Sequence, residues 1–142
     1  VLSLWVTWGD TQYANANRTA TAQIKKQAAG HPGTVWFQGH WGFQHYMEQS
    51  GFKPVDKTRS SLKPGDVLVI PVNNINLFNL PRHLLEPLPS IQIPQKTGVT
   101  TVSWERGAGF YSDVKGPLPF VIGRASPEKF LVFILKGGIR FE

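Results

Sequence analysis

Residues 35–48 read V-W-F-Q-G-H-W-G-F-Q-H-Y-M-E, and this stretch decides how the chain is expected to fold. Three apolar residues at 35–37 predict a short buried strand, Gly39 and Gly42 bracket a turn, and the residues that follow have helical spacing. A strand that ends in such a turn and reopens as a helix directs free backbone N–H groups at whatever lies above it. The stretch therefore predicts an α/β domain with a polar crevice.

Size and composition indicate one folded domain, residues 1–142. The chain is 41% hydrophobic, with 5 Trp and 9 Phe, which is enough for a true core. Its 14 Gly and 11 Pro predict many turns. Cysteine is absent, which excludes disulfides and thiolate chemistry and leaves the cellular compartment open. No run approaches the roughly 20 apolar residues that a membrane-spanning helix needs.

The first half, residues 1–72, predicts a small Rossmann-like β-α-β-α-β unit with a parallel sheet. The turn Lys63-Pro64-Gly65-Asp66 precedes a continuous apolar run that is typical of a strand buried on both faces. An alanine-rich stripe in the first helix allows it to pack close to the sheet. The expected elements in chain order are a strand at 2–8, a helix that ends near 29, a strand at 34–37, a helix at 42–50 and a strand at 67–70.

The second half, residues 73–142, is expected to be mostly β and rich in loops. Its prolines forbid long helices, and its asparagines suit turns. Period-2 and β-branched patterns predict short strands that extend or flank the same sheet. These strands are expected at 90–93, 99–104, 120–122 and 130–135.

Polar residues follow the expected parallel strands, where open α/β sheets bind their ligands. An acid, an imidazole, an indole and two amides would converge there, and this set suits a hydroxylated or phosphorylated ligand. Trp41 would offer a flat face to a sugar ring, while His40 with the helix N–H groups would favour phosphate or carboxylate. The alternative is that these residues only cap helices and fill turns. The candidate ligand-binding residues are Asp10, Gly39, His40, Trp41, Asn73 and Asn74.

A second unusual segment, residues 106–120, combines glycines, aromatics and prolines. This composition predicts a shaped loop that presents Phe110 and Tyr111, and Tyr111 joins the candidate ligand-binding residues. The alternative is a packed corner in which the two rings cover the sheet.

No pattern in the chain predicts a metal, a cofactor or a catalytic residue. His40 and His45 lie on different helix faces, and no H-E-x-x-H is present. The glycines at 39–42 lack the phosphate-loop and dinucleotide patterns, and no serine occupies a nucleophile elbow. Glu48, Glu105 and Asp113 lie too far apart in sequence to be paired by argument.

The net charge of +6 favours anionic neighbours. A basic loop, defined as Lys53, Lys57, Arg59 and Lys63, is the densest positive region and is a candidate contact for anionic lipid headgroups. The alternative is an ordinary solvated loop. Nucleic acid is not the expected partner, because no recognition motif accompanies the charge.

Three segments together resemble the tail of bacterial multi-spanning glycosyltransferases of the dolichyl-phosphate-mannose–protein mannosyltransferase-like family. They are residues 10–18 (D-T-Q-Y-A-N-A-N-R), residues 35–48, and residues 108–123 (A-G-F-Y-S-D-V-K-G-P-L-P-F-V-I-G). The likeness covers most of the chain in the same order and includes the P-G-D-V-L-V turn and strand. Three positions depart from the family pattern: His45 stands where an aromatic residue is expected, and Val114-Lys115 stands where a more aromatic pair is expected.

The resemblance implies a non-catalytic domain on the extracytoplasmic, periplasmic side of the bacterial inner membrane. It would assist binding of the acceptor or of a polyprenyl-phosphate-linked sugar carrier, or brace the membrane-spanning part of the same polypeptide. The family's catalytic acid lies in an early membrane loop that nothing here matches, so no catalytic residue carries over. The apolar start at residues 1–6 fits excision after a membrane span. The alternative is an independent α/β domain that binds or hydrolyses a small molecule with Asp10, His40 and Asn73.

Overall fold

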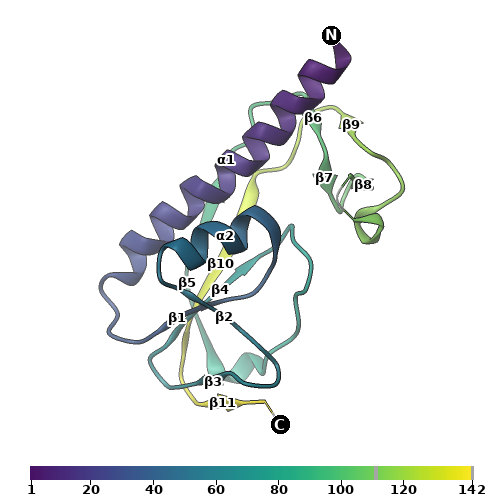
Figure 1. Cartoon of the computed structure of the whole chain (residues 1–142). Coiled ribbons are helices and arrows are strands. Elements are labelled where there is room, and N and C mark those ends of the chain that lie inside the picture. Colours follow the sequence, from purple (N-terminus) through teal and green to yellow (C-terminus); the bar gives the residue numbers. More distant parts are fainter. Residues whose placement is uncertain (111, 142) are drawn as a thin grey trace.

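The computed structural model describes residues 1–110 and 112–141 and shows a mixed α/β domain built on one five-stranded sheet (Figure 1). The strand order is β2-β1-β4-β10-β5, with β1 parallel to both β2 and β4, and β10 antiparallel to both β4 and β5. The strands of this sheet are β1 (Val35–Phe37), β2 (Lys53–Pro54), β4 (Val67–Pro71), β5 (Leu85–Ile93) and β10 (Glu128–Leu135).

The strand predicted at residues 2–8 is wrong, because these residues begin the long helix α1 (Leu2–Ala28). Helix propagation adds one backbone hydrogen bond per residue, which outweighs the cost of about 1 kcal/mol for Gly9 inside the helix. Gly9 itself serves close packing, since a Cβ there would lie 2.8 Å from the carbonyl oxygen of Val99. The Rossmann-like order thus lacks its expected first strand, and parallel pairing is confined to β1, β2 and β4.

The helices α1 and α2 (Trp41–Gln49) cover one face of the sheet (Figure 1). Ala20 and Ile24 of α1 are fully buried, and their small or slim side chains bring α1 close to the strands. The Phe43 ring of α2 contacts Phe37 edge-on at 5.9 Å and Phe130 at 5.2 Å between ring centroids. The predicted helix at 42–50 and strands at 34–37 and 67–70 are therefore confirmed with boundary shifts of one residue.

Irregular segments cover the other face of the sheet. Leu62, Leu80 and Ile139 pack there against Leu68 and the half-buried Phe133. This explains the uninterrupted apolar run of β4, which has core on both sides. The short elements on this face are β3 (Ser61–Leu62), the 3-10 helix η1 (Arg82–Leu84) and β11 (Ile139–Arg140), and β3 pairs with β11.

The second half extends the same sheet through β5 and β10, as predicted. The predicted strands at 90–93 and 130–135 fall within these longer strands. Pro87 and Pro89 lie inside β5, which is possible because β5 is an edge strand and need not donate on its open side.

Residues 97–127 form a small lobe beside the N-terminal half of α1 (Figure 1). Side-chain hydrogen bonds that join the lobe to the rest of the domain include Thr101 to Asp10 at 3.0 Å, Asn73 to Val102 at 2.9 Å and Lys115 to Asn74 at 2.8 Å. Its pairs are β6 (Val99–Thr100) with β9 (Val121–Ile122) and β7 (Val102–Ser103) with β8 (Ala108–Gly109), followed by the 3-10 helix η2 (Asp113–Lys115). Within the described residues, no helix is both long and apolar enough to cross a membrane.

Candidate functional site

Two neighbouring cavities open between the carboxyl end of β4 and the lobe. The carboxylate cavity has a volume of about 280 Å³ and is lined mainly by Asn73, Trp104, Glu105, Ser126 and Glu128. The lysine cavity has a volume of about 680 Å³ and is lined mainly by His40, Asn74, Asn76, Trp104 and Lys115. Val72 and Trp104 line both cavities, so the two share a wall.

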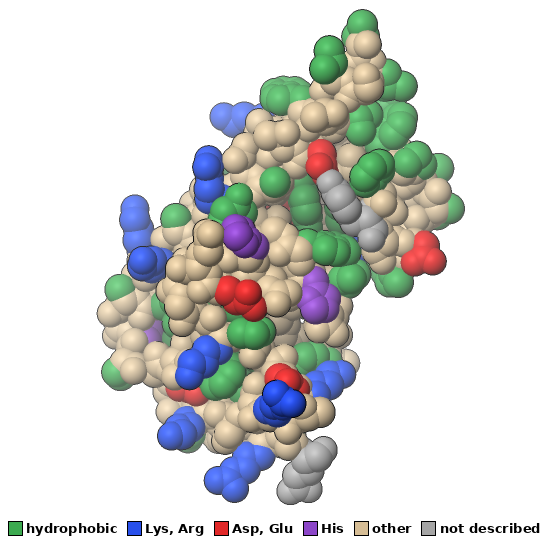
Figure 2. All heavy atoms as spheres, in the orientation of Figure 1, with side chains coloured by type: hydrophobic (Ala, Val, Ile, Leu, Met, Phe, Trp, Pro, Cys, Tyr) green, Lys and Arg blue, Asp and Glu red, His purple; other side chains and the backbone are tan. Residues whose placement is uncertain are grey.

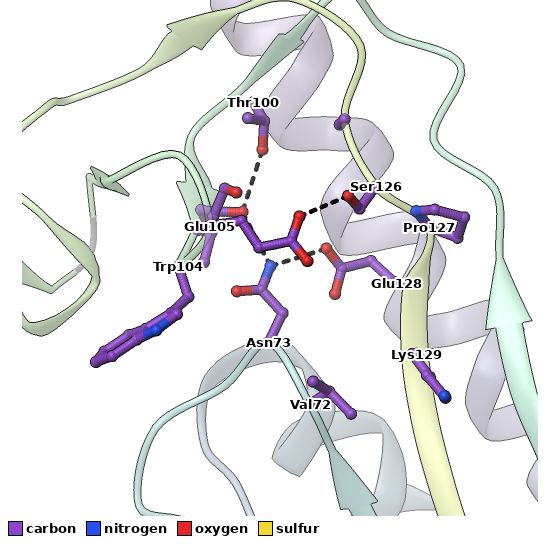
Figure 3. A pocket seen from close by; sticks show the side chains of 12 residues that line it. Val72, Asn73, Thr100, Trp104, Glu105, Ser126, Pro127, Glu128 and Lys129 are labelled. Carbon is purple, nitrogen blue, oxygen red and sulfur yellow. Dashed lines mark hydrogen bonds between the residues drawn. The ribbon is translucent and has the colours of Figure 1, made fainter.

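Glu128, the first residue of β10, is the central group of the carboxylate cavity. It is only 7% exposed, and its Oε1 accepts a hydrogen bond from Asn73 Nδ2 at 2.9 Å (Figure 3). Burial raises the pKa of Glu128 from 4.5 to about 7, although the Asn73 hydrogen bond and the positive charge of Lys115 act in the opposite direction. A carboxyl group that titrates near neutral pH in a cavity is typical of functional sites.

The carboxylate cavity also has unused acceptor capacity. Figure 3 shows the carboxylates of Glu105 and Glu128 directed toward the same space, with the amide of Asn73 beside them. Glu105 Oε2 accepts a hydrogen bond from Ser126 Oγ at 2.8 Å. Asn73 Oδ1 is buried and has no hydrogen-bond partner among the described residues. These oxygens can accept hydrogen bonds from a ligand's hydroxyl or amino groups.

Trp104 stands at the boundary between the two cavities. Its side chain is 64% exposed, and the indole extends from the edge of the carboxylate cavity away from Glu105 (Figure 3). The Lys115 ammonium lies 5.6 Å from the centroid of the Trp104 ring, which is the geometry of a cation–π contact. The exposed indole therefore provides an apolar surface next to a set of hydrogen-bond acceptors.

Lys115 is the second buried charge of the site. It is 6% exposed, and its Nζ donates to the backbone carbonyl of Asn74 at 2.8 Å. Burial lowers the pKa of Lys115, and the negative charge of Glu128 partly opposes this shift. The two buried groups therefore have pKa values that are displaced toward each other.

Neither Glu128 nor Lys115 is among the site residues predicted from the sequence. Glu128 shares the inward face of β10 with Phe130 and Val132, so period-2 alternation could have marked it as a buried acid. Lys115 had a weaker signal, since it belongs to the pair Val114-Lys115 that departs from the aromatic residues expected there.

Two of the predicted residues, Gly39 and His40, lie in the turn after β1, and a third, Asn74, follows β4 and hydrogen-bonds to that turn. Asn74 Oδ1 accepts from the His40 backbone N–H at 2.8 Å, and Asn74 Nδ2 donates to the His40 carbonyl at 3.2 Å. Gly39 has φ 97°, and a Cβ there would lie 2.7 Å from Pro71 Cγ. Asn74 and Gly39 thus have the turn-forming role named as the alternative. His40 lines the lysine cavity, and its Nδ1 lies 2.9 Å from Gln44 Oε1.

The remaining predicted residues do not share one cavity. Asp10 and Trp41 line a separate cavity of about 190 Å³ with Tyr13 and Asn17. Asp10 Oδ1 accepts a hydrogen bond from Thr101 Oγ1 at 3.0 Å. Asp10, His40 and Asn73 therefore line three different cavities, and Tyr111 lies outside the described residues.

The basic loop lies at the end of the molecule opposite the start of α1, around β2 and β3 (Figure 1). All four of its cationic residues are exposed. Lys57 Nζ lies 4.5 Å from the centroid of the Phe78 ring, and Lys53 Nζ lies 5.8 Å from that of Trp36. Across residues 1–110 and 112–141, no cluster of three or more His, Cys, Asp or Glu is arranged to hold a metal ion.

Comparison with protein-family models, with curated proteins and with solved structures gave no match for this chain.

Proposed function

We propose that this chain is a non-catalytic, extracytoplasmic domain of a bacterial membrane glycosyltransferase that uses a polyprenyl-phosphate-linked sugar donor. In this proposal the carboxylate cavity binds a sugar of the acceptor or of the carrier. The observation that carries the proposal is the convergence of Asn73, Glu105 and Glu128 in one cavity with the exposed indole of Trp104 at its edge.

Carbohydrate chemistry fits this combination of groups. A sugar ring has an apolar C–H face that packs on an indole, while its hydroxyl groups donate hydrogen bonds to carboxylates and amide oxygens. The cavity volume of about 280 Å³ is at the lower limit for small-molecule sites. It therefore suits a single sugar ring better than a long chain.

The finer, Rossmann-like interpretation of the fold belongs to this proposal. The parallel pairing of β1 with β2 and with β4, and the helix α2 between β1 and β2, support this interpretation. Ligands of doubly wound sheets bind beyond the carboxyl ends of the parallel strands. Both cavities lie beyond the carboxyl end of β4, since Val72 and Asn73 or Asn74 line them.

Exposed apolar side chains support contact with the membrane-spanning part of the same polypeptide. The large hydrophobic residues that are exposed all fall in residues 1–8, 72–77 and 104–122. Figure 2 shows hydrophobic side chains gathered where the start of α1 and the lobe lie. Exposed apolar patches of this kind mark interaction surfaces. We refer to this end of the molecule as the apolar end.

The anionic-lipid contact through the basic loop is a competing proposal. A helix of 27 residues is about 40 Å long, and α1 runs from the apolar end toward the middle of the domain (Figure 1). A membrane that the apolar end meets end-on therefore lies too far from the basic loop to contact it. Binding to anionic and to neutral vesicles distinguishes contact through the basic loop from contact through the apolar end.

A second candidate function is an independent α/β domain that binds or hydrolyses a small molecule. The observation in its favour is the Glu128 carboxyl group, with a pKa of about 7, in a cavity that a second carboxylate, Glu105, also lines. Such a pair can supply a general acid and a general base. In this version the residues that act on the small molecule are Glu105 and Glu128, whereas the sequence predicted Asp10, His40 and Asn73 for that role.

Titration of methyl mannoside, followed by tryptophan fluorescence and calorimetry, tests the binding proposal. We expect saturable binding that weakens about fivefold in Trp104→Ala, as a stacked ring contact implies. Trp8→Ala is the matched control, because Trp8 is also exposed but lies on α1. Binding that is absent, or unchanged in Trp104→Ala, would contradict the proposal.

Activity assays separate the two candidate functions. The first predicts no sugar transfer from polyprenyl-phosphate donors and no hydrolysis of aryl glycosides by the isolated chain. Hydrolysis that disappears in Glu128→Gln would favour the second candidate. The coding sequence upstream of Val1 gives an independent test, since several apolar spans support the first candidate and a nearby start codon supports the second.

A further inference from the structure

We infer that the lysine cavity binds a small oxyanion such as phosphate, with Lys115 as the cation that holds it. The inference deepens the proposed function in one respect: an oxyanion here can belong to the same ligand as the sugar in the neighbouring cavity. The anion site itself rests on the geometry around Lys115.

The ammonium of Lys115 has hydrogen-bonding capacity that the described residues do not use. An ammonium carries three N–H donors, and among the described residues one acceptor is supplied, the Asn74 carbonyl at 2.8 Å. The Trp104 ring at 5.6 Å holds the same group on another side. These two contacts fix the position of the cation and leave donors for a ligand.

In the part of the chain that the structure describes, Lys115 has no carboxylate in contact. Among the described residues, the ion pair that forms joins Lys136 to Glu86 at 3.8 Å, on the surface. Glu128 attracts Lys115 only at longer range, and its own carboxylate is bonded to Asn73. A charge that is 6% exposed without a counter-ion in contact is unfavourable, and a bound anion offsets that cost.

The rest of the cavity suits a polar anionic group. Its volume of about 680 Å³ leaves room for more than a phosphate. His40 lines it and immediately precedes α2, whose N-cap has no side-chain hydrogen bond. The cavity adjoins the carboxylate cavity at Val72 and Trp104. A ligand with a sugar and a phosphate can therefore place one group on each side of Trp104.

The experiment compares methyl mannoside, mannose 1-phosphate and inorganic phosphate as probes, by calorimetry on the whole chain. The variant is Lys115→Met, which keeps an unbranched side chain shorter by one heavy atom and removes the charge. The control is Lys136→Met, which removes a lysine from an exposed ion pair. Thermal unfolding of each variant verifies that it is folded.

We expect the wild type to bind mannose 1-phosphate about tenfold more tightly than methyl mannoside, the effect of one hydrogen bond between charged groups. Lys115→Met should remove this difference, and Lys136→Met should retain it. Equal binding of both sugars by the wild type would overturn the anion site and leave the sugar site standing. Binding of inorganic phosphate that depends on Lys115, without sugar binding, would support the anion site and contradict the proposed function. Absence of binding by all three probes would overturn both.

Vesicles of phosphatidylcholine with phosphatidic acid identify the source of the phosphate. If Lys115→Met abolishes vesicle binding as well as mannose 1-phosphate binding, a lipid headgroup enters the lysine cavity and the inference holds for lipid phosphate. If the variant loses mannose 1-phosphate and keeps vesicle binding, the inference holds for a free phosphate ester. Retention of both ligands by the variant would overturn it.

Discussion

Asn73 and Glu128 lie 55 positions apart in the chain, and the Asn73 side-chain amide donates a hydrogen bond to the Glu128 carboxylate over 2.9 Å. The same amide donates to the carbonyl of Val102 in the lobe at 2.9 Å. Asn73 thus joins the end of β4, the start of β10 and the lobe. This junction is also a wall of the carboxylate cavity. The protonation state of Glu128 therefore affects both the cavity and the free energy of unfolding.

Stability should fall as the pH rises through the range in which Glu128 ionises. Between pH 4.5 and about 7 the unfolded state releases the proton of Glu128 while the folded state retains it. The folded state then binds more protons, so the free energy of unfolding decreases with pH. The loss is complete above the folded pKa and amounts to about 3 kcal/mol at most.

Urea unfolding at pH 5, 6, 7 and 8 measures this effect in the wild type and in Glu128→Gln. The variant keeps an oxygen acceptor for Asn73 and cannot ionise, so its stability should vary less over this range. Glu86→Gln is the control, because Glu86 is exposed. Equal pH dependence of stability in all three proteins would contradict a raised pKa of Glu128 in the folded state.

Asp66 should contribute strongly to stability through three hydrogen bonds. Its carboxylate accepts from the Thr34 backbone at 2.9 Å, from Trp36 Nε1 at 2.8 Å and from the Lys63 backbone at 2.9 Å. Asp66→Ala should lower the free energy of unfolding by about 3 kcal/mol, because three part-buried donors lose their acceptor. Asp56→Ala is the control, since its carboxylate accepts from Thr58 on an exposed loop. A similar loss in both variants would argue against a special role for Asp66.

Gly33 and Gly30 lie in the same turn and should respond differently to alanine. A Cβ at Gly33 would collide with the carbonyl oxygen of Gly65 and lie 2.8 Å from the Cα of Asp66, whereas Gly30 has no heavy atom within 4 Å of that position. Gly33→Ala should therefore cost about 1–3 kcal/mol, as overpacking does, and Gly30→Ala should be close to neutral. Chemical denaturation of the two variants measures this difference. Equal stability would show that the backbone around Gly33 shifts to accommodate a Cβ at little cost.

Binding to anionic vesicles should distinguish the basic loop from general positive charge. If the loop contacts headgroups, replacing Lys53, Lys57, Arg59 and Lys63 by Gln should weaken sedimentation with anionic vesicles at low salt, at about 1 kcal/mol per charge. The matched control replaces Arg18, Lys25, Lys26 and Lys96, which removes the same charge elsewhere. An equal loss in both proteins would mean that only net charge matters. Binding by neutral vesicles would favour the apolar end instead.

The sequence was informative where local pattern and tertiary environment agree. The run at 67–70 is apolar throughout because β4 has core on both faces, and that pattern is visible without coordinates. Residues 2–8 were different, because their apolar and β-branched composition suits a strand and a helix equally. The continuation of α1 through Gly9, which packs closely on Val99, depends on a contact 90 positions away in the chain.

The candidate site depended still more on tertiary structure. The sequence by itself determined that polar residues follow buried strands, and it identified His40, Asn73 and Asn74 at those ends. Only the tertiary structure brought the lobe over them, with Trp104, Glu105 and Lys115, and placed Glu128 of β10 beside Asn73. The physical reason is that burial shifts the pKa values of both Glu128 and Lys115, and burial is a property of the packed chain rather than of any segment.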